Sequence, residues 1–98
     1  MPAENDIQLN SVVSRSPETL SNSIDDETVL LDMAKSSYYG LGPVASHIWK
    51  VIVEPVRVGA VVDQLLDEYE VSRAQCERDV LIFLRQLYVE GLLLVRVS

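Results

Sequence analysis

Residues 72–91, with the sequence SRAQCERDVLIFLRQLYVEG, contain the clearest fold signal in this chain of 98 residues. Ser72 is a preferred N-cap residue, and Gln75 stands three positions later, where a capping box places glutamate or glutamine. Gly91 is placed to end the helix, since glycine tolerates the left-handed conformation of a C-terminal cap. Between these ends, apolar residues recur at helical spacing as one stripe, namely Cys76, Val80, Phe83, Leu84 and Leu87. The segment therefore predicts an amphipathic helix with one buried face.

Two further helices are predicted before this one. Gly42-Pro43 opens the first, because proline is favoured at the first helical position. We expect this helix to stop at Pro55, because the residue before a proline is disfavoured in helical geometry. Its apolar stripe consists of Val44, Ile48, Val51 and Ile52. The second helix carries a longer stripe, made of Val58, Val61, Val62, Leu65, Leu66 and Tyr69.

The chain before residue 42 has the composition of β-strands. Three β-prone runs are predicted as strands, namely Ser11–Arg15, Glu27–Asp32 and Ser37–Leu41. The polar stretch from Glu18 to Ser23 is predicted to be a loop. The second and third strands are close enough in sequence to form a hairpin. Residues Leu92 to Val97 are a candidate for a final short strand.

The order of these elements predicts a mixed fold. A hairpin cannot bury its apolar face alone, so the strands must pack on the helices. We therefore predict an α+β fold of winged-helix type, with a three-stranded antiparallel sheet followed by three helices. Ninety-eight residues suffice for one domain. We assign that domain to residues 1–98 and expect residues 1–7 to be flexible.

Charge and composition argue against several classes of function. The 15 acidic and 8 basic side chains give a formal charge of −7, which repels phosphate backbones, so we expect no nucleic-acid partner. No apolar run is long enough to span a bilayer, and none has the form of a secretion signal. We therefore expect no membrane partner and a cytoplasmic location. The single cysteine, Cys76, cannot form an internal disulfide, which suits a reducing compartment.

No pattern in the sequence indicates catalysis, a cofactor or a metal. His47 is the only histidine, and no further ligand lies at zinc-site spacing. A protease dyad of Cys76 and His47 is conceivable. However, Cys76 lies on the apolar stripe, where burial raises the pKa of a thiol and leaves it inert. Gly40 and Gly42 are not followed by the Gly-Lys-Ser/Thr of a phosphate-binding loop. We therefore predict that the protein is not an enzyme and holds no cofactor or metal.

An ordered set of short motifs resembles one protein family over roughly residues 8–95. In chain order the motifs are Leu30-Leu31-Asp32, Tyr38-Tyr39-Gly40-Leu41, Ile48-Trp49, Pro55, Leu65-Leu66, Tyr69-Glu70-Val71, Cys76-x-x-Asp79-Val80, Phe83-Leu84, Leu87 and Gly91-Leu92. No single motif is specific, but the ordered set resembles the PqqD-like family, whose domains are recognition elements for ribosomally synthesised, post-translationally modified peptides. The combination is most similar to the stand-alone members of lasso-peptide biosynthesis. Gly42 departs from the family, which more often has a polar residue there, and we interpret it as a variant helix start.

This resemblance implies a non-catalytic function, the binding of the leader region of a precursor peptide. It further implies that the leader is presented to a leader peptidase and to the macrocycle-forming synthetase. In the family the leader adds as a strand, which here places it along Ser36–Leu41 and against the helix from Arg73 to Tyr88. Strand addition is physically reasonable because an edge strand carries unpaired backbone groups. The implied peptide-binding residues are Lys35, Ser36, Ser37, Tyr38, Tyr39, Gly40, Leu41, Arg78, Asp79, Ile82, Phe83 and Gln86.

Strand alternation separates the two adjacent tyrosines. Successive side chains of a strand point to opposite faces, so Tyr39 and Leu41 are predicted to face the core and Tyr38 the other side. Whether either tyrosine binds a ligand or only packs is left open by the sequence. Asp79, Ile82 and Gln86 lie off the apolar stripe of the last helix and are expected along a cleft.

Two other functions fit the same order of elements. A winged-helix DNA-binding domain needs a recognition helix with an excess of basic residues. The last helix carries no such excess, since Arg73, Arg78 and Arg85 are balanced by Glu77, Asp79 and Glu90. A structural adaptor would differ from a peptide-binding domain in recognising a folded surface instead of an extended chain.

Overall fold

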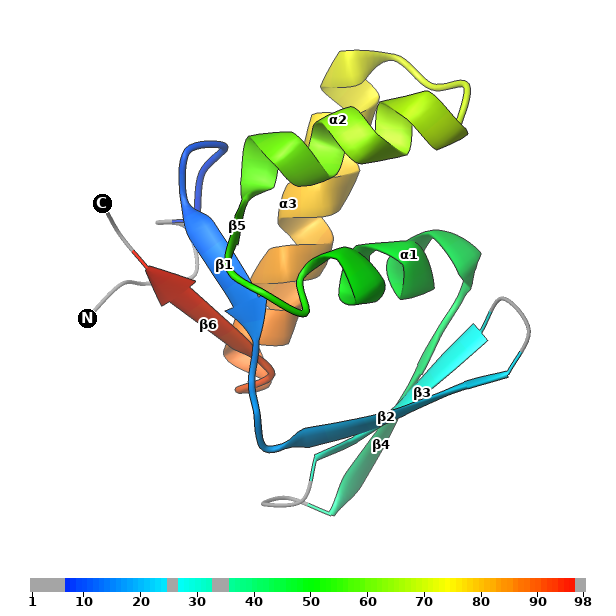
Figure 1. Ribbon diagram of the computed structural model, residues 1–98, viewed down its shortest axis with the longest axis vertical. Helices are drawn as coiled ribbons and strands as arrows, with labels where there is room; N and C mark the ends of the chain where they lie inside the picture. Colours follow the sequence, from blue (N-terminus) through cyan, green and yellow to red (C-terminus); the bar gives the residue numbers. More distant parts are fainter. Residues whose placement is uncertain (1–6, 25–26, 33–35, 97–98) are drawn as a thin grey trace.

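The fold is described from a computed structural model that covers residues 7–24, 27–32 and 36–96. Within these ranges four strands precede α1, a short strand separates α1 from α2, and a last strand follows α3 (Figure 1). In chain order the elements are β1 (Val12–Arg15), β2 (Thr19–Ile24), β3 (Glu27–Asp32), β4 (Ser37–Leu41), α1 (Pro43–Val51), β5 (Val56–Arg57), α2 (Val58–Glu68), α3 (Arg73–Val89) and β6 (Leu93–Arg96).

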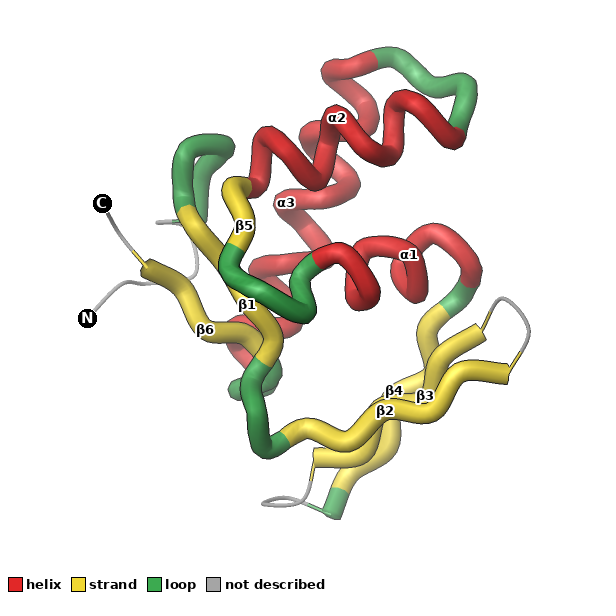
Figure 2. Tube along the Cα trace, viewed as in Figure 1, coloured by secondary structure: helices red, strands yellow, loops and turns green. Residues whose placement is uncertain are grey.

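The strands form two antiparallel sheets of three strands each. One contains β2, β3 and β4 in chain order, and the other has β1 between β5 and β6. The chain passes from β1 to β2 through residues 16–18, and the two strands then belong to separate sheets (Figure 2). Helix α1 packs on β3 and β4, while α3 packs on α2 and on β6.

The predicted fold class is confirmed, because a three-stranded antiparallel sheet is followed by three helices. The predicted first strand exists as β1 but lies in the other sheet. The prediction of a loop from Glu18 to Ser23 is wrong, since β2 pairs with β3 from Thr19↔Asp32 to Ile24↔Glu27. Five of the six β2 residues are exposed. This strand therefore depends on backbone pairing and lacks the buried alternation by which a sequence reveals a strand.

The helices begin where the sequence predicts, but α1 ends early. Its C-cap is Ile52, so Pro55 does not terminate it. The Ile52 carbonyl accepts a hydrogen bond from the Arg15 N–H at 2.9 Å. A contact with β1 thus takes the place of the next helical bond. None of the described helices has both the length and the apolar character that crossing a membrane requires.

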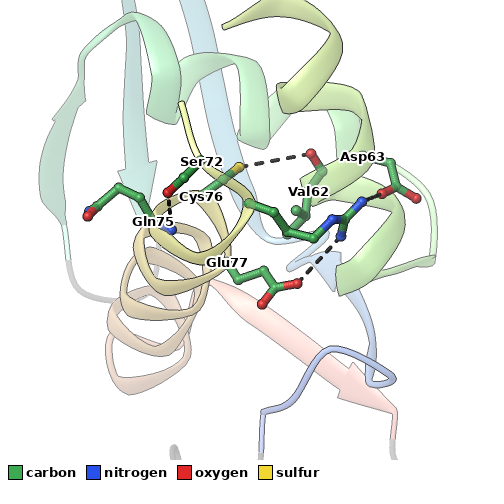
Figure 3. A network of polar contacts seen from close by, with 7 residues as sticks. Val62, Asp63, Ser72, Gln75, Cys76 and Glu77 are labelled. Atoms are coloured by element: carbon green, nitrogen blue, oxygen red, sulfur yellow. Dashed lines mark hydrogen bonds and ion pairs between the residues drawn. The ribbon is translucent and has the colours of Figure 1, made fainter. Parts of the chain in front are cut away.

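Both ends of α3 are capped at the predicted residues, but the predicted capping box does not form. Ser72 Oγ accepts a hydrogen bond from the Gln75 N–H at 3.1 Å (Figure 3). The Gln75 side chain does not reach back to complete a capping box, because its Nε2 donates to Asp79 Oδ1 at 2.9 Å. At the other end Gly91 has a φ of +78°. The chain then turns into β6.

Gly91→Ala is expected to lower the free energy of unfolding by about 1 kcal/mol, because alanine is strained at a left-handed φ. Gly40→Ala is the matched control. Neither glycine has a heavy atom within 4 Å of an added Cβ, but of the two only Gly91 has a positive φ. Urea unfolding of both variants measures the difference. An equal loss in the two would contradict the conformational explanation.

The core lies between the helices and the strands packed on them. Its largest fully buried side chains are Trp49, Ile7, Leu30, Ile52, Leu65, Leu84 and Leu92, together with several valines. The Ile7 carbonyl also accepts a hydrogen bond from Arg85 Nη2 at 2.9 Å. Ile7 is therefore packed in the core and bonded to α3, while residues 1–6 lie outside the described part of the chain, so the flexibility of residues 1–7 stays a prediction.

Candidate functional site

Strand β4 is an edge of its sheet and contains five of the twelve predicted site residues, Ser37 to Leu41. It pairs with β3 from Ser37↔Asp32 to Leu41↔Thr28, and no described strand pairs with its other side. An edge strand offers backbone donors and acceptors to which an extended chain can add. Strand β2 is the opposite edge, but β4 is the edge that faces α3 across a groove.

This β4–α3 groove has a volume of about 510 Å³. One wall is β4 with the glycine that follows it, and the other is the C-terminal half of α3. The lining residues are Tyr38, Tyr39, Gly40, Leu41, Gly42, Ala45, Phe83, Gln86, Leu87, Glu90 and Leu92. The groove therefore combines an open strand edge with a partly apolar wall, which are the two features needed to hold an extended peptide.

A second cavity continues the groove toward the N-terminus of α3. This α1–α3 pocket has a volume of about 290 Å³ and a mostly apolar lining. Its residues are Val44, Ala45, Ile48, Leu65, Tyr69, Val71, Cys76, Asp79, Val80 and Phe83. Ala45 and Phe83 line both cavities. A chain lying beside β4 can therefore extend past Phe83 into an apolar pocket.

Tyr39 joins the two walls of the β4–α3 groove. Its hydroxyl donates a hydrogen bond to Glu90 Oε2 at 2.6 Å. This bond, with burial and the carboxylate charge, raises the pKa of the Tyr39 phenol, so the hydroxyl remains a donor at neutral pH. Tyr39 packs against the core, whereas Tyr38 is 75% exposed. The predicted opposite orientation of the two side chains is confirmed.

The structure places the predicted site residues in three groups. Those along the β4–α3 groove are Tyr38, Tyr39, Gly40, Leu41, Phe83 and Gln86, and Asp79 lines the α1–α3 pocket. Ser37 begins β4, and Ser36 precedes it with a φ of 54°. Arg78 and Ile82 are exposed on α3 and line neither cavity. The predicted contact Lys35 lies outside the described residues.

Several lining residues were missed by the sequence analysis. Glu90 could have been found, because Asp79, Phe83, Gln86 and Glu90 follow each other at spacings of four, three and four residues on one face of α3. Val44 and Ala45 gave no such signal. They reach the site only because the first turn of α1 packs beside β4 and α3, which is a property of the tertiary structure.

The geometry does not support a catalytic pair of Cys76 and His47. The Cys76 side chain is buried, and its Sγ lies 3.9 Å from the Val62 carbonyl oxygen (Figure 3). Burial is the main cause that raises the pKa of this thiol, so it stays protonated and a poor nucleophile. His47 packs edge-on to the Tyr69 ring and lines a different cavity, beside Lys50. The thiol therefore behaves as a small core side chain.

Comparison with known proteins identifies the family of this chain. The family described as coenzyme PQQ synthesis protein D (PqqD) matches residues 27–93. This chain belongs to the PqqD family. The predicted family is thereby confirmed, and the match includes β3, β4 and all three helices. No curated protein has significant similarity to the chain.

Two solved structures resemble this PqqD-family chain over most of its length. TbiB1 in complex with the TbiA(beta) leader peptide is 39% identical, covers 87% of this chain and 99% of that chain, and has a TM-score of 0.80. Lasso peptide synthetase B1 complexed with the leader peptide is 29% identical, with coverages of 84% and 96% and a TM-score of 0.75. These similarities confirm the fold class and the resemblance to proteins of lasso-peptide biosynthesis.

Proposed function

We propose that this PqqD-family chain binds the leader region of a ribosomally synthesised precursor peptide in lasso-peptide biosynthesis. The observation that carries the proposal is the position of β4. It is an edge strand beside an apolar groove, in a chain whose two structural relatives were both solved with a leader peptide. Residues 1–98 then act as one recognition domain.

The leader adds as a strand along β4 and lies against α3. Backbone hydrogen bonds to the open edge supply affinity that does not depend on sequence, and pockets for alternate side chains supply specificity. Leader side chains on the same face as Tyr39 and Leu41 enter the β4–α3 groove. Beyond Phe83, a further apolar side chain of the leader occupies the α1–α3 pocket.

The role of the protein in this pathway is to hold the leader and present the precursor to other enzymes. These are a leader peptidase and the synthetase that closes the macrocycle. The protein itself contributes binding and no covalent chemistry, since its one thiol is buried and protonated. A free thiol is also compatible with action in the reducing cytoplasm.

Charge supports a peptide partner over a nucleic acid. Arg73, one of three arginines on α3, forms ion pairs with Asp63 and Glu77. Its charge is therefore already compensated within the protein. Together with a net charge of −7, this leaves α3 without the basic surface that a DNA-recognition helix requires.

Phe83→Ala is expected to weaken leader binding by about tenfold, because a buried aromatic side chain at the centre of an interface contributes more than 1 kcal/mol. Ile82→Ala is the matched control, since Ile82 is the neighbouring apolar residue, is 49% exposed and lines neither cavity. Fluorescence polarisation measures affinity for a labelled leader, with thermal melts on the same samples. Suitable probes are the TbiA(beta) leader peptide and the leader of this protein's own precursor.

A leader with scrambled sequence completes the experiment. We expect the scrambled peptide to bind at least tenfold more weakly, because backbone pairing alone gives little discrimination. The proposed site is wrong if both variants bind the leader as the parent does. The proposed function is wrong if the parent binds neither leader more tightly than its scrambled form.

A further inference from the structure

The β2–β3–β4 sheet has an outer face that no described element covers. The register places Leu20, Leu31 and Tyr38 in one cross-strand row and Asn22, Val29 and Gly40 in the next. The opposite face holds the buried side chains of Thr28, Leu30 and Leu41. On the outer face, by contrast, Leu20, Val29 and Tyr38 are 54%, 43% and 75% exposed.

Gly40 lies on this outer face, where neither the backbone conformation nor the packing requires a glycine. Glycine weakens a strand, and inside a strand it often marks the close approach of a ligand or another backbone. Gly40 does not have the positive φ that requires glycine at Gly91. Nor is it needed for packing, because no heavy atom lies within 4 Å of an added Cβ, whereas at Gly59 the Leu9 carbonyl oxygen lies at 3.4 Å. Nothing in residues 7–24, 27–32 and 36–96 therefore accounts for the missing side chain.

Gly40 leaves this face without a side chain opposite Val29 on β3 and next to Tyr38 two residues back on β4, and no heavy atom lies within 4 Å of an added Cβ. We refer to this space as the Gly40 notch. Gly42, the next residue but one, is also a glycine in extended conformation, with φ −72° and ψ −177° and open space around an added Cβ. Past Tyr38 the outer side of β4 thus carries no side chain, and Val29, the cross-strand neighbour of Gly40, is 43% exposed.

We infer that the Gly40 notch is a second specificity site for the leader, on the sheet face opposite the β4–α3 groove. It takes a long apolar or aromatic leader side chain that lies across Gly40 and contacts Val29. This inference rests on the proposed function, because a strand added at β4 must point its alternate side chains to the outer face. The leader strand added at β4 would thus lie next to the Gly40 notch and fill it with one of its side chains.

The spacing between strands determines which leader side chains can reach Val29. Neighbouring strands lie about 4.8 Å apart, so the leader backbone would lie about 10 Å from β3. A small side chain at that position cannot reach Val29. Aromatic and long side chains make cross-strand contacts at offsets of about 7–8 Å, so only a side chain of that size, lying across Gly40, can approach Val29. An aromatic side chain placed across a strand glycine also covers its exposed backbone. The bound segment of the leader should therefore carry large apolar residues on both of its faces.

Val29→Ser tests this inference without altering the strand that receives the leader. We expect leader affinity to fall about fivefold, the loss of a cross-strand apolar contact. Leu20→Ser is the matched control, since Leu20 is equally apolar, exposed and on the same face, but lies on β2, away from the leader edge. Its affinity should equal that of the parent. Fluorescence polarisation with the TbiA(beta) leader and the protein's own leader measures all three proteins.

An alanine scan of the leader identifies the side chain in the notch. Substitution at one apolar position should weaken binding to the parent and have little additional effect in Val29→Ser, because the two changes remove the same contact. The inference is overturned if Val29→Ser binds as the parent does, or if every leader substitution has the same effect in both proteins. Either result is distinguishable from failure of the proposed function, in which the parent does not prefer the leader over its scrambled form.

Discussion

Replacing Leu84 with aspartate is expected to unfold the protein. Leu84 is 0% exposed and belongs to the core stripe of α3, which packs on α2 and β6. Its loss removes apolar burial worth about 2–5 kcal/mol, and the new carboxylate adds the cost of an unpaired buried charge. The total of about 4 kcal/mol or more is a large part of the stability of a small domain. Far-UV circular dichroism and a thermal melt should show loss of the cooperative transition.

Ile82→Asp provides the control for Leu84→Asp. Both residues lie on α3 and receive the same substitution, but Ile82 is 49% exposed. A surface substitution of this kind changes stability by roughly 0.5 kcal/mol. A cooperative, parent-like melt of Leu84→Asp would mean that α3 presents a different face to the core.

Proline in β4 is expected to separate leader binding from folding. Proline has no N–H, and along an edge strand successive N–H groups alternate between the neighbouring strand and the open edge. Tyr38→Pro and Tyr39→Pro therefore remove hydrogen bonds on opposite sides of β4. One of the two variants should keep its melting temperature within a few degrees and lose leader binding by at least about tenfold. The other loses a bond to β3 and should be destabilised by about 2 kcal/mol.

Alanine at the same positions separates backbone from side-chain effects. Tyr38→Ala and Tyr39→Ala retain the N–H groups, so the loss of binding that a proline variant shows beyond its alanine counterpart is the backbone effect. The second proline replaces Tyr39 and not Ser37, because a proline at position 37 would conflict with the left-handed φ of 54° at Ser36. If both proline variants fold and bind the leader as tightly as the parent, addition of the leader at β4 is wrong.

Much of the helical half of the fold could be predicted from the sequence. The cap at Ser72, the stripe from Cys76 to Leu87 and the glycine at position 91 are local signals, because helix caps and helical periodicity depend on residues within a few turns. The hairpin of β3 and β4 could also be predicted, because its two strands are close in the sequence. The end of α1 could not be predicted, because the Ile52 carbonyl is hydrogen-bonded to Arg15 in β1, far away in the sequence.

Sheet membership could not be predicted from the sequence. The exposed, polar β2 has almost no pattern of its own and is a strand because β3 supplies its backbone partners. β1 has a recognisable β-prone sequence, yet its partners are β5 in the middle of the chain and β6 near residue 95, both far away in the sequence. Such pairings depend on non-local hydrogen bonds, which a local pattern cannot encode.

Part of the candidate site could likewise be predicted from the sequence, and part could not. The sequence by itself predicted the family, the strand motif Tyr38-Tyr39-Gly40-Leu41 and the buried stripe of α3 from Cys76 to Leu87, because these are contiguous or periodic along the chain. Only the tertiary structure decided that Ala45 lines the groove and Val44 the adjoining pocket, that Ile82 lines neither, and that Gly40 is the cross-strand partner of Val29. The physical reason is that a cavity is made by side chains from several elements, and their relative placement is fixed by packing.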